Sequence, residues 1–338
     1  MKAMVIKNGW GPENIQPEDR PDPEPAHGEI VIRMQAVSIN PRDLIMSQGG
    51  YGRMGGSIPL VPLCDGAGVV AAIGAAVEGL SEGDLVVPHY SRTWMHGLTS
   101  AANQAGAHGG PLDGTAQELF CVPANAVVKA PAHMDAAQAA TLPCAAVTAW
   151  SAVVGQGGVK PGDLILLQGT GGVSLFALQF AKMHGAEVIM TSSSDAKFEK
   201  VRALGADHLV NYRKTPDWHK SAREISGGDG VDHVVEVGGG ATLDSAIGCT
   251  RPGGAISLIG VLSGGMAKLN LGRVVTRNIR LQGVTLGSHQ LLGEMCRAME
   301  VHRTAPVIDE ERFALEDLGA ALAALPAGRH FGKVVGEV

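Results

Sequence analysis

Residues 164–174 read LILLQGTGGVS, and this stretch decides the fold of the chain. Leu164–Gln168 is a short, mostly apolar run, which is typical of a parallel strand buried on both faces. Three glycines follow within four residues. Residues 173–184 then repeat apolar side chains at helical spacing as far as Gly185, a common helix stop. A strand, a glycine-rich turn and a helix in this order predict a βα unit that binds a dinucleotide.

The same alternation continues through the middle of the chain. A second helix is expected at residues 195–204, with Asp195 as its cap and Gly205 as its stop. Strands that alternate with helices predict βαβ units and a parallel sheet. We therefore expect an α/β fold with a doubly wound, parallel six-stranded sheet. Its further strands are expected at residues 187–191, 208–212, 232–237, 255–260 and 281–286.

The two ends of the chain have a different texture. Proline and glycine clusters separate short apolar runs in the first third, which predicts β strands at residues 3–6, 29–37, 68–72 and 85–88. Residues 89–115 have no clear period and are expected to form a long loop. A last helix (315–325) and strand (333–335) are expected to return to this first domain. The predicted domains are 1–124 with 290–338, and 125–289.

Composition restricts the classes of protein that the chain can belong to. At 338 residues, with 45% hydrophobic and 18% charged residues, it is a folded protein longer than one hydrophobic core usually supports. A net charge of −6 and only 4% aromatic residues argue against a nucleic-acid partner. Two domains and a small-molecule substrate are therefore expected.

Targeting signals and cysteine usage indicate a compartment. The first residues, MKAMVIKNGW, lack the features of a signal peptide, and no stretch of about 20 apolar residues exists that could span a membrane. The five cysteines are odd in number and form no CxxC pair, which argues against a disulfide scaffold or a four-cysteine zinc lobe. We expect a cytoplasmic protein without a membrane partner.

The glycine-rich turn supplies the first candidate binding residues: Gly169, Thr170, Gly171, Gly172 and Val173. The first glycine allows a tight turn, and the second lets the backbone approach a pyrophosphate at the helix N-terminus. Ser174 stands where the pattern has its third glycine and is still small enough for close helix–strand packing. The alternative is a plain glycine turn of an α/β protein.

The end of the second predicted strand indicates which dinucleotide is bound. An NAD site usually has Asp or Glu there, but the chain has hydroxyl groups at Ser192 and Ser193, with Lys197 close behind. Such groups suit a 2′-phosphate, so NADPH is favoured over NADH. Lys197 could equally be a solvated helix lysine. Gly238, Gly260 and Val261 follow later strands, at the edge where ligands bind in such sheets.

Over nearly its whole length the chain resembles the quinone-oxidoreductase branch of the medium-chain dehydrogenase/reductase superfamily. This superfamily also contains the zinc alcohol dehydrogenases. The resemblance implies a GroES-like β domain built from both ends of the chain, a Rossmann domain between them, an active site in the cleft and a homodimer. The segments that carry it are Gly28-Glu29, Asn40-Pro41-Arg42-Asp43, residues 64–70 (CDGAGVV), residues 83–86 (GDLV), residues 141–144 (TLPC), residues 148–150 (TAW), residues 169–174 (GTGGVS), residues 204–207 (LGAD) and residues 332–335 (GKVV).

The chain departs from the zinc-dependent members at the catalytic metal. Where those members have Cys, His and Cys as ligands, this chain has Asn40, Cys64 and Cys144, and Asp65 stands in place of a neighbouring Glu. An amide is a poor zinc ligand, so no metal is expected. A partial site built from Cys64, Asp65 and Cys144 is the alternative.

The resemblance and the missing ligands together imply the chemistry. Without a metal, hydride transfer to a quinone or an α,β-unsaturated carbonyl is favoured, because conjugation already polarises the accepting carbon. Two other readings stay open: a zinc-assisted alcohol dehydrogenase or aldehyde reductase, and a non-catalytic module that binds NADPH.

Roles for individual residues follow from the same resemblance. Asn40 is expected at the nicotinamide end, donating to the cofactor ribose or to the substrate oxygen. The catalytic candidates are Asn40, Tyr51, Tyr90 and Asp65, although Asp43 and Asp65 suit supporting roles better than that of an acid. His89 and Trp94 are further pocket candidates. Thr148 is expected beside the nicotinamide, and Tyr212 and Lys333 near the adenosine phosphate.

Overall fold

The computed structural model describes residues 1–338, except for the side chains of Arg53 and Met54. The chain forms two compact units, Met1–Val147 with Ser288–Val338 and the intervening residues 148–287. The first division falls later than the predicted boundary after residue 124. The reason is that β7 (Val127–Lys129) pairs with β5 (Leu85–Pro88) in the sheet of the first unit.

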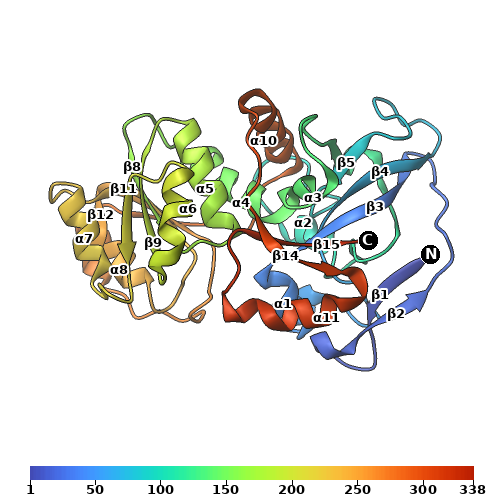
Figure 1. The fold of residues 1–338 in the computed structure, drawn as a ribbon, viewed down its shortest axis with the longest axis horizontal. Helices are drawn as coiled ribbons and strands as arrows, with labels where there is room; N and C mark the ends of the chain where they lie inside the picture. Colours follow the sequence, from blue (N-terminus) through green and yellow to red (C-terminus); the bar gives the residue numbers. More distant parts are fainter. The chain divides into compact units, whose positions relative to one another are not determined.

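The second unit contains the six-stranded parallel sheet that the sequence predicted (Figure 1). The strand order is β10-β9-β8-β11-β12-β13, the order of a dinucleotide-binding fold. The first strand, β8, begins and ends where the sequence predicted. The strands are β8 (Leu164–Gln168), β9 (Glu187–Ser192), β10 (His208–Asn211), β11 (Val231–Glu236), β12 (Thr250–Leu258) and β13 (Arg280–Gly283).

Helices cover this sheet on both sides, so successive residues of its central strand β8 are buried. Leu166 packs in a core with Ala222 and Ile247, which belong to α7 and α8. Its neighbours Ile165 and Leu167 point the opposite way and are also fully buried, and α5 contacts β8 and β9. The helices are α4 (Val147–Trp150), α5 (Gly172–Met183), α6 (Phe198–Ala203), α7 (Trp218–Ile225), α8 (Leu243–Cys249) and α9 (Leu271–Thr276).

The helix expected at residues 195–204 is shorter than predicted. Asp195–Lys197 is a 3-10 turn that begins after Ser194, and α6 follows it. Asp195 is therefore not a helix cap. Its carboxylate accepts hydrogen bonds from Asn211 and Lys214 instead.

The first unit is built around a mainly antiparallel sheet in the order β14-β15-β3-β4-β5-β7, with β6 also paired to β3. β15 pairs with β3, so the last strand returns to this unit as predicted. A separate ribbon joins β1 and β2. The remaining strands are β1 (Lys2–Ile6), β2 (Ile15–Asp19), β3 (Glu29–Ile39), β4 (Asp65–Ile73), β6 (Leu119–Pro123), β14 (Ile308–Ala314) and β15 (Lys333–Glu337).

Several elements of the first unit have no counterpart in the sequence prediction. Among them are β2, β6 and β14 and the 14-residue helix α10. The aperiodic residues 89–115 contain the short helix α2 and an isolated bridge between Ser91 and Ala107. The helices of this unit are α1 (Pro41–Ser47), α2 (Ala101–Ala105), α3 (Ala136–Ala139), α10 (His289–His302) and α11 (Leu318–Ala324).

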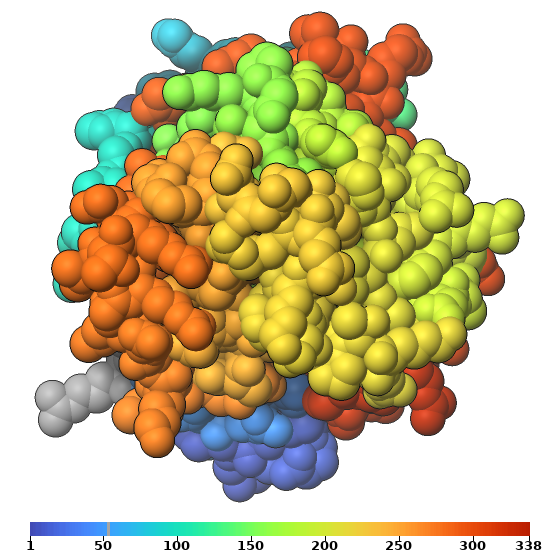
Figure 2. Space-filling model, turned by 90° about the vertical axis from the view of Figure 1, so that its left-hand side faces the viewer, coloured from blue at the N-terminus to red at the C-terminus, as the bar shows by residue number. Residues whose placement is uncertain are grey.

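The segment around residues 260–280 of the second unit carries exposed apolar side chains. This segment is orange in Figure 2. Five apolar residues of this segment are more than half exposed: Val261, Leu262, Met266, Leu271 and Val275. Among the described residues, no helix is both long and apolar enough to cross a bilayer.

Candidate active site

The start of α1 fixes the first group of candidate residues. Pro41 occupies the first helical position, where its missing N–H costs nothing. The backbone N–H of Asn40 donates to Asp43 Oδ2 at 2.8 Å. This cap holds the side chains of residues 40, 42 and 43 at one end of the helix, which explains the Asn-Pro-Arg-Asp pattern.

Asn40 lies in a buried polar cluster with Asp43, Asp65 and Lys333. Its Nδ2 donates to Asp65 Oδ2 at 2.8 Å and to Asp43 Oδ2 at 3.2 Å. The Lys333 ammonium donates to Asp65 Oδ2 at 3.0 Å, to the Ile39 carbonyl at 2.9 Å and to Asn40 Oδ1. Both amide N–H bonds of Asn40 and all three N–H bonds of Lys333 therefore have acceptors within the protein.

This arrangement differs from the roles predicted for Lys333 and Asn40. Lys333 was expected near the adenosine phosphate, but its side chain is only 3% exposed and is bound to Asp65. Asn40 was expected to donate to the cofactor or substrate, but its donors are already used. Asp65 accepts hydrogen bonds from both residues, which is compatible with the supporting role predicted for it.

The remaining zinc-type donors lie next to this cluster. One ligand atom each from Cys64, Asp65 and Cys144 falls within 4.8 Å of the others. The set fits a tetrahedral zinc poorly, because one oxygen of Asp65 already binds the Lys333 ammonium and Asn40 offers an amide. Burial raises the pKa of the Cys64 thiol well above its usual value, and a hydrogen bond with Cys144 raises it further.

Arg42, Tyr51 and Tyr90 form a second group of candidate residues in the first unit. The Arg42 guanidinium carbon lies 5.3 Å from the centre of the Tyr90 ring. Its Nη1 is 3.5 Å from Asp43 Oδ1, and both atoms are buried without a hydrogen bond to any described residue. Burial raises the pKa of Tyr90 to about 12 and also raises that of Tyr51, so both phenols stay protonated at neutral pH.

His89 and Trp94 are engaged in packing. His89 is fully buried, its Nδ1 lies 2.8 Å from the Ser91 carbonyl oxygen, and its ring meets Tyr90, Trp94 and His289 edge-on. Trp94 donates from Nε1 to the Gly97 carbonyl at 3.0 Å. His89 and Trp94 therefore both pack against the ring of Tyr90.

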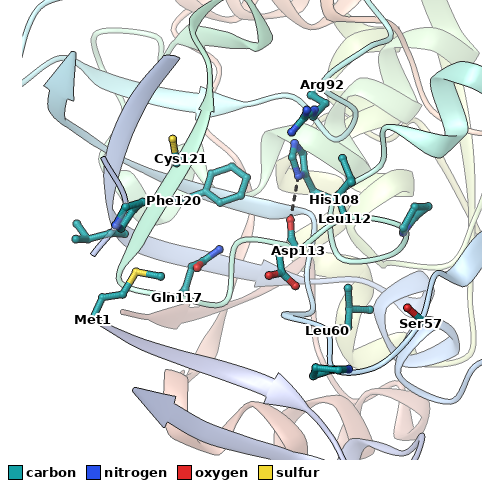
Figure 3. Close-up of a pocket in the computed structure, with 14 residues that line it drawn as sticks. Met1, Ser57, Leu60, Arg92, His108, Leu112, Asp113, Gln117, Phe120 and Cys121 are labelled. Carbon is teal, nitrogen blue, oxygen red and sulfur yellow. Dashed lines mark hydrogen bonds between the residues drawn. The ribbon is translucent and has the colours of Figure 1, made fainter. Parts of the chain in front are cut away.

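A separate cavity of about 420 Å³ lies elsewhere in the first unit (Figure 3). Its walls include Arg92, His108, Asp113, Gln117 and Phe120, and none of the catalytic candidates. Figure 3 shows Arg92 beside the His108 ring, whose Nδ1 lies 3.0 Å from the Asp113 carbonyl oxygen. Burial lowers the pKa of His108 to about 4, so the ring is neutral. No sequence pattern indicated this cavity.

In the second unit, the glycine turn leaves the N-terminus of α5 open. Gly171 is the N-cap residue, and no side chain caps the first turn. A Cβ atom built on Gly169 or Gly171 would meet nothing within 4 Å. Ser174 donates to the Gln168 carbonyl at 2.6 Å and so ties the helix to β8. Open space in front of unsatisfied backbone N–H groups fits a phosphate.

Two buried polar residues that the sequence analysis did not single out hold the neighbouring turns. Gln168 ends β8, donates to Glu236 Oε2 at 2.6 Å and accepts from the N–H groups of Val237 and Gly238. Glu236 ends β11 and accepts from Gly238, Gly239 and Thr242. The signal in the sequence that could have indicated Gln168 and Glu236 is a polar residue at the end of an otherwise apolar strand.

The turns after β11 and β12 approach each other closely. A Cβ atom on Gly260 would lie 2.1 Å from the Val237 carbonyl oxygen, so only glycine fits there. Ser263 donates from its backbone N–H and its hydroxyl to the Gly238 carbonyl. Gly238, Gly260 and Val261 thus lie together at the carboxyl edge of the sheet, as predicted.

The end of β9 provides the remaining cofactor candidates. The Tyr212 backbone N–H donates to the Ser192 carbonyl at 3.1 Å, so Tyr212 and Ser192 are neighbours. Ser193 is half-buried, and Lys197 closes the 3-10 turn that follows. Thr148 is buried in α4. The carboxylate of Asp195, in the same 3-10 turn, is paired with Lys214.

Comparison with known protein families agrees with both units. Residues 26–132 match the alcohol dehydrogenase GroES-like domain, and residues 172–321 match the zinc-binding dehydrogenase family. A zinc-type alcohol dehydrogenase-like protein of Schizosaccharomyces pombe is 40% identical, over 99% of this chain and 98% of its own length.

Solved structures give the same result. A putative alcohol dehydrogenase from Sinorhizobium meliloti superposes with a TM-score of 0.92 at 38% identity, covering 100% of this chain and 98% of that one. An NAD-dependent alcohol dehydrogenase superposes with a TM-score of 0.90 at 34% identity, with both chains fully covered. This chain is therefore an oxidoreductase of the medium-chain dehydrogenase/reductase superfamily.

More distant relatives have other activities. An NADPH-dependent alkenal/one oxidoreductase of Arabidopsis thaliana is 28% identical, over 99% of this chain and 79% of its own length. A mycobacterial protein complexed with NADPH superposes with a TM-score of 0.84 at 26% identity, over all of both chains. Both nicotinamide cofactors and several acceptor classes thus occur among the relatives.

Proposed function

We propose that this oxidoreductase uses NADPH to reduce a quinone or an α,β-unsaturated carbonyl compound without a catalytic metal. The observation that carries the proposal is the buried cluster at the metal position of the zinc enzymes. There Asn40 replaces one ligand, and the Lys333 ammonium binds the carboxylate of Asp65. A second cation beside this ammonium would be repelled, and the donor set of Cys64, Asp65 and Cys144 fits a tetrahedral zinc poorly.

The second unit would hold the cofactor. The uncapped N-terminus of α5 would receive the pyrophosphate, and Gly238, Gly260 and Val261 would line the edge where the dinucleotide lies. When bound, the dinucleotide supplies the hydride. The chain's own contribution would be to position the acceptor and to stabilise the charge that develops on its oxygen.

The preference for NADPH rests on the end of β9. Hydroxyl groups at Ser192 and Ser193 and the lysine at position 197 suit a 2′-phosphate. Asp195 would otherwise repel that phosphate, but the Lys214 ammonium is paired with its carboxylate and offsets its charge. The NADPH-dependent relative from Arabidopsis supports the same choice.

The first test is an activity assay on metal-stripped protein. NADPH and NADH are each supplied with one quinone, one cyclic enone and one aldehyde, and the loss of reduced nicotinamide absorbance is followed. The proposal predicts turnover of the quinone or enone with NADPH, unchanged by a chelator. Activity confined to the aldehyde, and dependent on added zinc, would overturn it.

Zinc-assisted alcohol oxidation is the second candidate. The observation in its favour is the close approach of Cys64, Asp65 and Cys144, all within 4.8 Å of one another. In that case Cys64→Ser and Cys144→Ser would abolish both zinc binding and turnover. A third possibility, a module that binds NADPH without catalysis, predicts cofactor binding and no turnover with any of these acceptors.

A further inference from the structure

If the proposed function holds, one group of the protein must bind the oxygen atom of the substrate. Hydride addition to an enone leaves a negative charge on the carbonyl oxygen, and the protein must offer a donor to it. The described donors of the polar cluster can be examined one by one, because buried donors and acceptors are normally paired.

Two candidate donors are already used. Asn40 donates both of its amide hydrogens, to Asp43 and to Asp65. Lys333 donates to three acceptors, and its side chain is 3% exposed. Neither can bind a substrate oxygen without giving up a buried hydrogen bond.

Arg42 is different. A guanidinium has five N–H donors, and no hydrogen bond from Arg42 to a described residue satisfies one of them. Asp43 Oδ1 lies 3.5 Å from its Nη1, beyond good hydrogen-bond distance, and has no hydrogen-bond partner among the described residues either. Leaving such atoms unpaired in a buried position is unfavourable, so it calls for an explanation by function.

The surroundings of Arg42 hold its guanidinium in place. The Tyr90 ring lies under it at 5.3 Å, and Asp43 is itself fixed by its bonds to Asn40. Burial alone would lower the pKa of Arg42, but Cys64, then Asp43, Cys144 and Tyr90, raise that pKa above its usual value. The guanidinium is therefore a permanent positive charge beside the two thiols, Cys64 and Cys144.

We propose that Arg42 is a catalytic residue whose free guanidinium N–H groups bind the substrate carbonyl oxygen and stabilise the oxyanion formed by hydride transfer. The hydride adds to the β carbon of the enone, the carbon–carbon π electrons shift toward the carbonyl, and the charge comes to rest on its oxygen. A proton from water then reaches the α carbon, which gives the saturated ketone and the oxidised dinucleotide.

The variants Arg42→Met and Arg42→Lys test this role, with Arg33→Met as the matched control on the exposed face of β3. We expect Arg42→Met to lower kcat/KM for the enone by about 10²- to 10³-fold, the usual effect of losing an oxyanion donor. Arg42→Lys should lose less, and Arg33→Met should behave as wild type. The dissociation constant for NADPH should stay within about threefold in all three variants, since the proposal assigns Arg42 to the substrate.

Chemical rescue distinguishes a catalytic role from a structural one. Low concentrations of guanidinium ion should restore turnover of Arg42→Ala in a saturable way, while an alkylammonium ion of similar size should not. Full activity of Arg42→Met, or a loss of activity matched by equal loss of NADPH binding, would overturn the proposal.

A measurement on the wild-type protein covers the case in which the Arg42 variants do not fold. 4-Nitrophenol is added with oxidised cofactor at a pH where the phenol is neutral in water. We expect the bound ligand to have the absorbance of the phenolate. A bound ligand that stays neutral would contradict an anion-binding guanidinium. If the wild-type protein reduces no quinone or enone, the proposed function is wrong. The absorbance of bound 4-nitrophenol then still shows whether Arg42 binds an anionic oxygen.

Discussion

At the scale of single residues, the first unit is organised around a buried pair of opposite charges. Lys333 and Asp65 are 3% and 0% exposed and lie 3.0 Å apart, with Asn40 completing the hydrogen bonds of both. Removing two charges from water is costly, and good geometry with further hydrogen bonds offsets that cost. The net stability gained from the intact pair is therefore smaller than the cost of removing one of its partners.

Replacing one member of this pair should be strongly destabilising. Lys333→Met leaves the Asp65 carboxylate buried without its cation, and we expect a loss of about 3–5 kcal/mol in the free energy of unfolding. Urea denaturation at neutral pH measures it. The double variant Lys333→Met/Asp65→Asn removes both charges and should lose clearly less. A loss below about 1 kcal/mol in the single variant would show that the pair is not desolvated as described.

Residues such as Lys333 mark the limit of prediction from one sequence. Its pairing partner Asp65 is 268 residues away in the chain, and no periodicity or spacing connects the two. Arg42 had no assigned role for the same reason, because its importance appears only when the hydrogen bonds around it are counted. The glycines of the βα turn could be predicted, since their function depends on backbone geometry within a few residues.

At the scale of elements, we propose that the turns at the carboxyl ends of the strands determine what the second unit binds. β8, β9, β11 and β12 all end in polar or glycine-containing segments, and Gln168 and Glu236 tie two of these turns together. We propose that the cofactor is selected at the end of β9 and in the turn after it, which hold Ser192, Ser193 and Lys197.

A carboxylate in this turn should reverse the cofactor preference. Ser193→Asp would repel a 2′-phosphate and could accept a hydrogen bond from a ribose hydroxyl. We expect the ratio of kcat/KM for NADPH to that for NADH to fall at least about tenfold, which corresponds to roughly 1.4 kcal/mol. Ser193→Asn has a similar size without the charge and serves as the control. An equal fall in both variants would mean that charge at this position does not select the cofactor.

The central strands of the sheet make stability depend on pH. His233 lies in β11, its Nε2 is 2.9 Å from Ser257 Oγ, and burial lowers its pKa from 6.5 to about 4. Between those values the unfolded chain binds a proton that the folded protein does not. The free energy of unfolding should therefore fall by about 3 kcal/mol through this residue as the pH drops from 6.5 toward 4.

Urea denaturation at several pH values, followed in the second unit, would measure this dependence. His233→Gln should flatten it, although the variant is less stable overall. His27→Gln changes an exposed histidine and should leave the slope as in the wild type. An unchanged slope in His233→Gln would contradict the assignment of a neutral His233 in the folded state.

Sequence patterns predicted some elements far better than others. The strand Leu164–Gln168 was predicted to the residue, because a strand buried on both faces leaves a continuous apolar run. Strand β2, by contrast, has only one buried residue in five, and Pro17 interrupts it. α10 was missed because it has four buried residues among fourteen, so its apolar face is weakly marked in the sequence.

At the scale of the whole molecule, the chain combines a β unit made from both of its ends with a dinucleotide-binding unit between them. The homodimer expected from the family resemblance stays a prediction. The edge strand β13 and the exposed apolar residues near α9 are the surfaces we propose for it. The mass in solution would test it against the 34.9 kDa of one chain.

Hydride transfer to a conjugated carbonyl compound without a metal is the reaction that we propose for this enzyme. The most direct test supplies NADPH deuterated at the transferring position of the nicotinamide, together with a cyclic enone and protein whose zinc content has been measured in the same sample. We predict deuterium at the β carbon of the saturated ketone, with zinc far below one atom per chain. Deuterium at the carbonyl carbon, in proportion to bound zinc, would contradict metal-free transfer to the β carbon and would make Cys64 and Cys144 metal ligands.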